Sequence, residues 1–195
     1  MGIRIESAKK YLDQIKNSLD ALSIEEINKI INVILQAYKN DKQIFIMGNG
    51  GSAVLASHFA CDLGKGTLQN VYDEKEKRFR VISLTDNVAM MTAFSNDLGY
   101  EHIFSQQLNN LVNEGDVVIA ISGSGNSKNV LDAVNLAKKN NAITVGFIGF
   151  DGGKLKDLVD FKIVVSSNHY GVIEDVHDIL HHMICSIISS VKNSV

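Results

Sequence analysis

The chain has 195 residues, of which 45% are hydrophobic and 21% are charged, a composition typical of one globular domain with a substantial core. Its formal net charge is −3 and no basic stripe runs along it, which argues against nucleic acid as a partner. No apolar run approaches membrane-spanning length, and Cys61 and Cys185 share no metal-binding spacing, so we expect a cytoplasmic protein with reduced thiols and no membrane partner.

The first part of the chain, residues 3–38, shows the periodicity of two amphipathic helices. Ser23 is followed by Glu25 and Glu26, which predicts the N-cap and the acidic first turn of the second helix. The first helix precedes every predicted strand and therefore has no sheet of its own to cover. We expect the helices of residues 1–38 to be used in oligomerisation, in a homotetramer.

Five short apolar runs follow and predict strands, at residues 43–47, 80–84, 116–121, 142–148 and 161–165. Helical patterns accompany them, at residues 53–63, about 88–95, 104–112, 128–139, 154–159 and 172–191. Residues 64–80 carry mixed charge without a clear period, so we expect a loop there. The alternation predicts an α/β fold, a three-layer, doubly wound, parallel five-stranded sheet, with residues 1–195 forming a single domain. No GxGxxG pattern occurs, which argues against a dinucleotide-binding fold.

Ligands of such a sheet bind beyond the carboxyl ends of the strands, which places residues 48–52, 85–87 and 122–127 on one rim. The last of these segments, Ser-Gly-Ser-Gly-Asn-Ser, joins a buried strand to a helix. Its hydroxyls, its glycines and the N–H groups of the helix N-terminus are suited to bind a phosphate. No lysine lies in the loop, so it is not a nucleoside-triphosphate loop. A polar turn with a serine N-cap is the alternative interpretation.

Titratable side chains recur at helical spacing on two predicted helices. His58 and Asp62 are four residues apart and therefore share one helix face. The terminal helix carries three more at successive steps of four, Glu174, Asp178 and His182. His177 and His181 are expected to be turned away from that face. The set His58, Asp62, Glu174 and His182 would suit zinc, although the spacing alone leaves open that these are surface pairs.

Several motifs occur together, in a characteristic order and spacing. They are Gly48-Asn49-Gly50-Gly51-Ser52, His58-Phe59-Ala60, Asn96-Asp97, Gly115-Asp116-Val117, Ile121-Ser122-Gly123-Ser124-Gly125-Asn126-Ser127 and Asp151-Gly152-Gly153. Together they resemble the sugar isomerase (SIS) family, and within it the phosphoheptose isomerases. The resemblance covers nearly the whole chain, including the leading helices.

The resemblance implies the SIS fold and an aldose–ketose isomerase that interconverts sedoheptulose 7-phosphate and D-glycero-D-manno-heptose 7-phosphate, for the heptose of surface polysaccharide. It also implies a homotetramer with sites between subunits and one zinc ion per subunit, held by His58, Asp62, Glu174 and His182. Asp62 and His182 fall on the catalytic base and acid of the family. The implied substrate contacts are Asn49, Gly50, Gly51, Ser52, Asp62, Asn96, Asp97, Ser122, Gly123, Ser124, Ser127 and Glu174.

The sequence departs from the family pattern near the expected site. Asp62 stands where the family has glutamate, and Glu174 stands where it has glutamine. Gly123 stands where the family has a second hydroxyl-bearing residue. Gly66 and Val172 lie near positions at which the family has arginines. A carboxylate in place of an amide ligand cancels positive charge and makes zinc a weaker Lewis acid. The chain therefore resembles a divergent member, which leaves a related sugar phosphate open as its substrate.

Two other functions occur among proteins that resemble this chain. One branch is non-catalytic and binds a sugar phosphate or a protein partner such as the replication initiator, but it has lost the metal and catalytic residues. This chain retains His58, Asp62 and His182, which argues against that branch. A regulator that senses sugar phosphates usually carries a DNA-binding domain, and none is visible in the sequence.

Overall fold

A computed structural model describes residues 5–192, so the predicted helix start at residue 3 lies outside the described part of the chain. Five strands form one parallel sheet: β1 (Gln43–Gly48), β2 (Arg80–Ser83), β3 (Val117–Ser122), β4 (Ile143–Gly149) and β5 (Phe161–Val165). Their spatial order is β2-β1-β3-β4-β5. The predicted α/β fold with a doubly wound, parallel, five-stranded sheet is confirmed.

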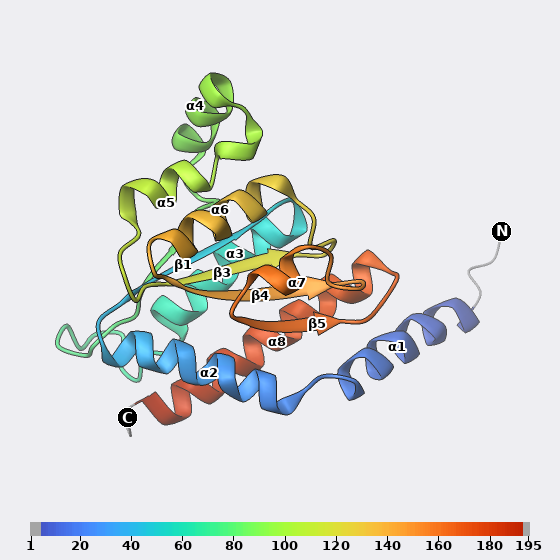
Figure 1. Ribbon diagram of the computed structural model, residues 1–195. Helices are drawn as coiled ribbons and strands as arrows, with labels where there is room; N and C mark the ends of the chain where they lie inside the picture. The colour runs from blue at the N-terminus through green and yellow to red at the C-terminus, as the bar shows by residue number, and fades with distance from the viewer. Residues whose placement is uncertain (1–4, 193–195) are drawn as a thin grey trace.

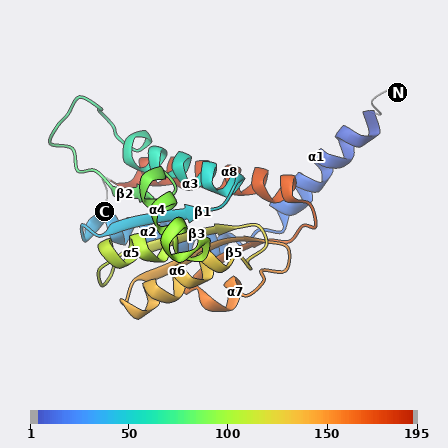
Figure 2. The same ribbon diagram turned by 90° about the horizontal axis from the view of Figure 1, so that it is seen from above.

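Helices cover both faces of the sheet and give the protein three layers (Figures 1 and 2). One face packs against α2 (Ile24–Lys39), α3 (Gly51–Cys61) and α8 (Tyr170–Val191), and the other packs against α5 (Ser105–Leu111), α6 (Lys128–Lys139) and α7 (Leu155–Leu158). Successive side chains of β1 point to opposite faces of the sheet. Ile44 and Ile46 face the first set of helices, and Phe45 and Met47 face the second. No helix within residues 5–192 has the length and apolarity needed to cross a membrane.

The strand order reverses between β1 and β3, which are hydrogen-bonded neighbours. β1 leads into α3 on one face and β3 leads into α6 on the other, so a crevice opens beyond their carboxyl ends. The register pairs Gly48 with Ile121, and the loops that follow the two strands therefore start side by side.

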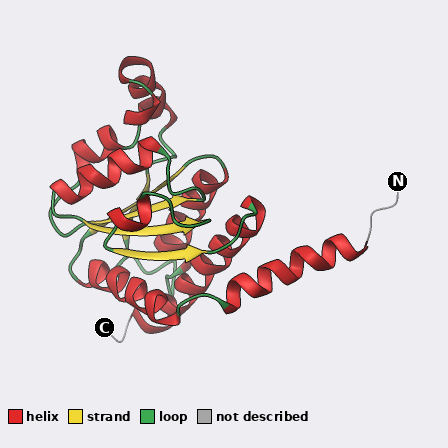
Figure 3. Cartoon of the chain, turned by 45° about the vertical axis from the view of Figure 1, so that its right-hand side comes forward, coloured by secondary structure: helices red, strands yellow, loops and turns green. Residues whose placement is uncertain are grey.

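The N-terminal helix, α1 (Ile5–Asp20), extends away from the sheet (Figure 3). It contacts α8, where the Tyr11 hydroxyl donates a 2.6 Å hydrogen bond to Asp175 Oδ2. Leu12 on this helix exposes 57% of its surface. The Ser23 side chain accepts a hydrogen bond from the Glu26 amide, which confirms the predicted N-cap of α2. The packing of α1 on another subunit stays a prediction.

Two helices are longer than predicted. α3 begins at Gly51 and continues into a π-helical turn, Asp62–Gly66, a widening of the helix that often marks a functional site. The helix predicted at about 88–95 is α4 (Val88–Leu98), and it includes Asn96 and Asp97. The helix therefore continues three residues beyond its predicted end, and it ends before Gly99, whose φ is +101°.

Residues 67–79 form an irregular connection, within the loop predicted at 64–80. Glu76 holds it in place by accepting hydrogen bonds from the amides of Gln69 and Asn70 and by pairing with Lys192 Nζ at 2.8 Å. The hydrogen bond from Lys192, followed by those from the two amides, lowers the pKa of Glu76 to about 2. The loop is thus fastened to the end of α8 by a charged carboxylate.

Candidate functional site

The serine-rich loop between β3 and α6 borders the crevice. Ser122 Oγ accepts a hydrogen bond from the Gly125 amide at 3.1 Å, and Ser124 Oγ accepts one from the Asn126 amide at 3.2 Å. Ser127 occupies the N-cap position of α6, yet its side chain makes no capping hydrogen bond. Its hydroxyl is therefore available to a ligand beside the first amides of α6, which favours the anion-binding interpretation of the loop over the capped turn.

Amide side chains tie the opposite loop, after β1, to α6. Asn49 Nδ2 donates to Asn129 Oδ1 and Asn129 Nδ2 donates to Asn49 Oδ1, both at 2.9 Å. The Tyr100 hydroxyl also donates to Asn49 Oδ1 at 2.9 Å. The Asn49 side chain is thus engaged in positioning the loop, which leaves the backbone of residues 49–51 for the expected substrate contact. Neither Asn129 nor Tyr100 belongs to a recognisable motif, so the sequence did not predict their part in the site.

A cavity of about 160 Å³, here called the serine-loop cavity, opens between these two loops. Its lining includes most of the expected substrate contacts: Asn49, Ser52, Ser122, Gly123, Ser124, Ser127 and Glu174. Tyr170, which sequence analysis missed, lies on one side of it. The Tyr170 ring is 3.0 Å from the place where a Cβ at Gly123 would stand, so a larger residue at Gly123 would displace this ring. The Tyr170 ring therefore lies beside the position that a hydroxyl-bearing side chain at residue 123 would fill.

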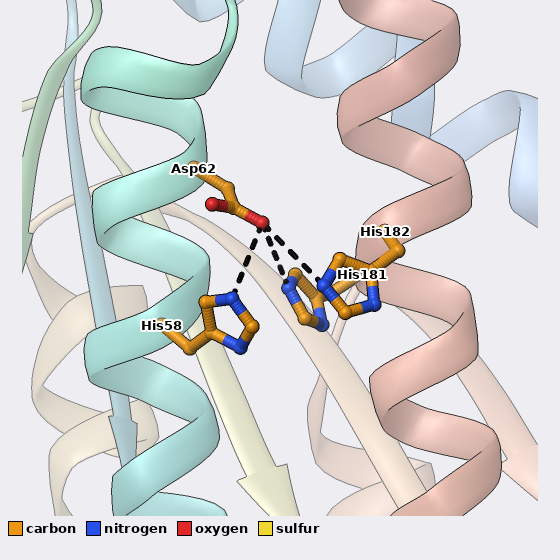
Figure 4. A group of neighbouring side chains, drawn as sticks. All are labelled: His58, Asp62, His181 and His182. Atoms are coloured by element: carbon orange, nitrogen blue, oxygen red, sulfur yellow. Dashed lines mark hydrogen bonds and ion pairs between the residues drawn. The ribbon is translucent and has the colours of Figure 1, made fainter.

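Three histidines and one carboxylate converge between α3 and α8 (Figure 4). Asp62 Oδ2 lies 3.2 Å from His181 Nε2, 3.6 Å from His58 Nε2 and 3.7 Å from His182 Nε2. One ligand atom of each residue lies within 4.8 Å of the others. We call these four residues the histidine group; they include three of the four expected metal ligands.

The expectation that His181 is turned away is wrong. Its side chain is fully buried, whereas that of His182 is 50% exposed, and both face α3. Consecutive residues of a helix are about 100° apart around its axis. Both side chains can therefore reach a neighbouring helix that lies between their two directions. His177 does point away, as predicted, and its Nε2 lies 3.3 Å from the Ile148 carbonyl oxygen. Burial lowers the pKa of His177 to about 4.

Asp178 lies on the other side of the three imidazole rings. Its Oδ1 is 3.3 Å from His181 Nδ1 and 3.7 Å from His58 Nδ1, and its Oδ2 is 3.7 Å from His182 Nδ1. The rings are therefore placed between two carboxylates. Asp178 faces the Nδ1 atoms and Asp62 faces the Nε2 atoms, so an ion bound on the Asp62 side would be held through Nε2. Its helical spacing predicted the face of α8 on which Asp178 lies, but predicted no role for it.

The protonation of His181 follows from its surroundings. Burial, and then the neighbouring His182 ring, lower the pKa of His181, while Asp62 opposes the change. No hydrogen bond of acceptable geometry reaches its buried Nδ1 atom, although Asp178 is near. A neutral ring at this place is the form that binds a metal.

Glu174 is absent from the histidine group, unlike the ligand set that we expected. Its carboxylate lies against the first residue of α3, where a Cβ at Gly51 would stand 2.6 Å from Glu174 Oε1. A second cavity, of about 210 Å³, is lined by Ser52, His58, Glu174 and Asp178, among others. Ser52 and Glu174 line both cavities, so Glu174 lies between the serine loop and the histidine group. Asn96 and Asp97 line neither cavity.

The arrangement combines an anion site with a cluster of titratable side chains. Among the described residues, no lysine or arginine lines the serine-loop cavity, so hydroxyls and helix amides are its donors to an anion. The histidine group offers three imidazole nitrogens and one carboxylate oxygen, which are ligands typical of zinc. The site is thus suited to bind a phosphorylated compound and to move protons on it.

Comparisons with known proteins agree with this geometry. Residues 10–149 match the SIS domain family. The chain is 38% identical to a probable phosphoheptose isomerase of Thermoplasma acidophilum, over 93% of this chain and 97% of that protein. It is 36% identical to a phosphoheptose isomerase of Clostridium acetobutylicum, over 92% and 94%. The solved structure of phosphoheptose isomerase from Neisseria gonorrhoeae superposes with a TM-score of 0.85 at 30% identity, over 95% of this chain and 96% of that one. This chain therefore belongs to the SIS domain family and, within it, to the phosphoheptose isomerases.

Proposed function

We propose that the protein interconverts the aldose and ketose forms of a phosphorylated sugar, with sedoheptulose 7-phosphate and D-glycero-D-manno-heptose 7-phosphate as the pair. The observation that carries the proposal is that two cavities of the site adjoin. The serine-loop cavity and the cavity beside His58 share Ser52 and Glu174, so one extended sugar phosphate can reach both. Family membership gives the reaction class. The role of the protein would be in heptose synthesis for surface polysaccharide.

Phosphate recognition falls to the serine loop. Ser122, Ser124 and Ser127 surround the cavity at the N-terminus of α6, where the helix dipole favours an anion. The phosphate is remote from the carbons that react. Its binding energy therefore serves to orient those carbons, which raises the rate of the chemical step.

The histidine group would hold one zinc ion per subunit. His58, Asp62, His181 and His182 supply the ligands, and Asp178 orients the rings. The donor set fits zinc in type and number, and burial favours the neutral form of His181, which is the form that binds a metal. A zinc ion held there would supply Lewis-acid polarisation of the sugar carbonyl. His182, half exposed, remains the proposed acid for the hydroxyl protons of the sugar.

A homotetramer of the cytoplasm, with sites between subunits, is the assembly that we propose. α1 extends from the body of the chain, and Leu12 is exposed on it. An apolar side chain on a helix without a sheet to cover is stabilised by packing against another subunit.

The experiment is a coupled assay of the purified protein with sedoheptulose 7-phosphate beside other ketose phosphates, together with metal analysis of the same sample. We expect turnover of sedoheptulose 7-phosphate and about one zinc ion per chain. Absence of turnover with every ketose phosphate, in a protein that contains zinc, would contradict the proposal.

A further inference from the structure

Asp62 and Asp178 lie against the histidine rings, whereas Glu174 does not, and an aldose–ketose isomerase needs a carboxylate or another group as a base. We propose that Glu174 removes and returns the carbon-bound proton, and that Asp62 serves only in the histidine group. This inference rests on the proposed isomerase function. It differs from the role that the family resemblance gives to Asp62.

Asp62 is engaged with the histidines. Its Oδ2 atom is the closest common neighbour of three Nε2 atoms, at 3.2, 3.6 and 3.7 Å. Only the contact with His181 is a hydrogen bond, but an ion held by the three nitrogens would also be bound by Oδ2 and would offset the negative charge of the Asp62 carboxylate. The Asp62 carboxylate is then a poor acceptor for a proton from carbon.

Glu174 has the opposite surroundings. It is exposed, and it takes part in no hydrogen bond or ion pair that the described residues form. It lines the serine-loop cavity and also the cavity that contains His58, so a sugar phosphate that spans the two passes its carboxylate. Both its oxygens are available to that ligand.

Gly51 provides the space for this carboxylate. A Cβ at this position would stand 2.6 Å from Oε1, 2.8 Å from Cδ and 2.9 Å from Oε2 of Glu174. Gly51 is also the first residue of α3, so the carboxylate lies beside the positive end of that helix. The glycine and the helix end together hold a negative group at the border of the two cavities.

The chemistry balances without a further reactant. A Glu174 oxygen takes the proton from C2 of the aldose, and the electron pair of the C–H bond forms the C1–C2 double bond. The carbonyl π pair moves to O1, which gives an enediolate. The O2 proton is transferred to O1, for which His182 is the proposed carrier, and the Glu174 carboxylic acid returns its proton to C1. The product is the ketose, and the carboxylate is regenerated.

The test compares Glu174→Gln with Asp62→Asn and with Asp157→Asn, a matched carboxylate-to-amide change on an exposed residue of α7. Three quantities are measured: zinc per chain, substrate affinity and the exchange of the carbon-bound proton with D₂O, followed by NMR. Glu174→Gln should keep its zinc and bind substrate, but lose turnover and exchange by about 10³-fold, within the range that a general base contributes. Asp62→Asn should lose zinc, and Asp157→Asn should resemble the wild type.

Two outcomes would overturn the inference. One is proton exchange by Glu174→Gln within about threefold of the wild type. The other is loss of exchange in Asp62→Asn that still contains a full complement of zinc. Glu174→Asp distinguishes the loss of a base from a structural effect. It retains a carboxylate on a shorter side chain, so it should show more proton exchange than Glu174→Gln. If the wild type itself turns over no ketose phosphate, the proposed function fails instead, which is a distinguishable result.

Discussion

Replacing Gly51 by alanine tests the geometry of the site without touching an ionisable group. The new Cβ would stand 2.6 Å from Glu174 Oε1, whereas ordinary contacts begin at 3.4 Å, so the carboxylate must move by about 0.8 Å. A misplacement of about 1 Å in a catalytic group costs on the order of 100-fold in rate. We expect kcat of Gly51→Ala to fall by about that factor.

The same change should not harm folding. Gly51 is helical, its φ is not positive, and the atoms that it displaces are the end of a flexible side chain. Alanine in a helix is more stable than glycine by up to about 1 kcal/mol, so the melting temperature should stay constant or rise.

Gly50→Ala is the matched comparison for this experiment. Gly50 has φ of +56°, and no atom lies within 4 Å of the place where its Cβ would stand. Alanine at this position would therefore strain the backbone without a steric clash. A loss of about 1–3 kcal/mol in stability is expected. The assay is steady-state kinetics beside thermal unfolding of both variants. A Gly51→Ala enzyme with unchanged kcat would refute the placement of Glu174 against the substrate.

Three further predictions concern the phosphate, the metal and acid stability. Ser127→Ala should raise KM by about 10- to 150-fold, because it removes a hydrogen bond of about 1.5–3 kcal/mol to a charged group; an unchanged KM would place the phosphate elsewhere. His181→Asn should lower zinc affinity by more than about 100-fold and Asp178→Asn by about 10- to 100-fold, since a lost ligand costs more than a lost outer-shell partner. Competition with a chromophoric chelator measures both, and the reverse ranking would contradict the ligand assignment. The pKa of Glu76 is lowered from 4.5 to about 2, so its stabilising effect is complete above pH 4.5 and is lost as the pH falls toward 2. Thermal unfolding should therefore show Glu76→Gln and the wild type converging at acid pH, and a constant difference would show that this carboxylate has no such role.

Much of the fold could be predicted from local sequence patterns. Each strand is a short apolar run bounded by turn residues, so the β-sheet was predicted with boundaries within one residue. Ser23 also identified the start of α2 correctly, because the capping interaction is local. The end of α4 was missed, since Asn96 and Asp97 are poor helix formers, yet the helix continues through Leu98 and ends at Gly99.

The site was predicted in part, and the errors have one cause. Spacing of four residues places His58 with Asp62, or Asp178 with His182, on one face of a single helix. It does not tell which face of α8 meets α3, and this contact decides that His181 belongs to the group and that Glu174 turns toward Gly51. Pairings between distant segments, such as Tyr170 against Gly123, likewise have no signal in one sequence.

The most direct test of the account is the turnover of sedoheptulose 7-phosphate by the wild-type protein before and after removal of metal. The account predicts that a chelator abolishes turnover and that zinc restores it in proportion to the zinc bound, up to about one ion per chain. Full activity in a protein that contains no metal, unaffected by chelators, would contradict it.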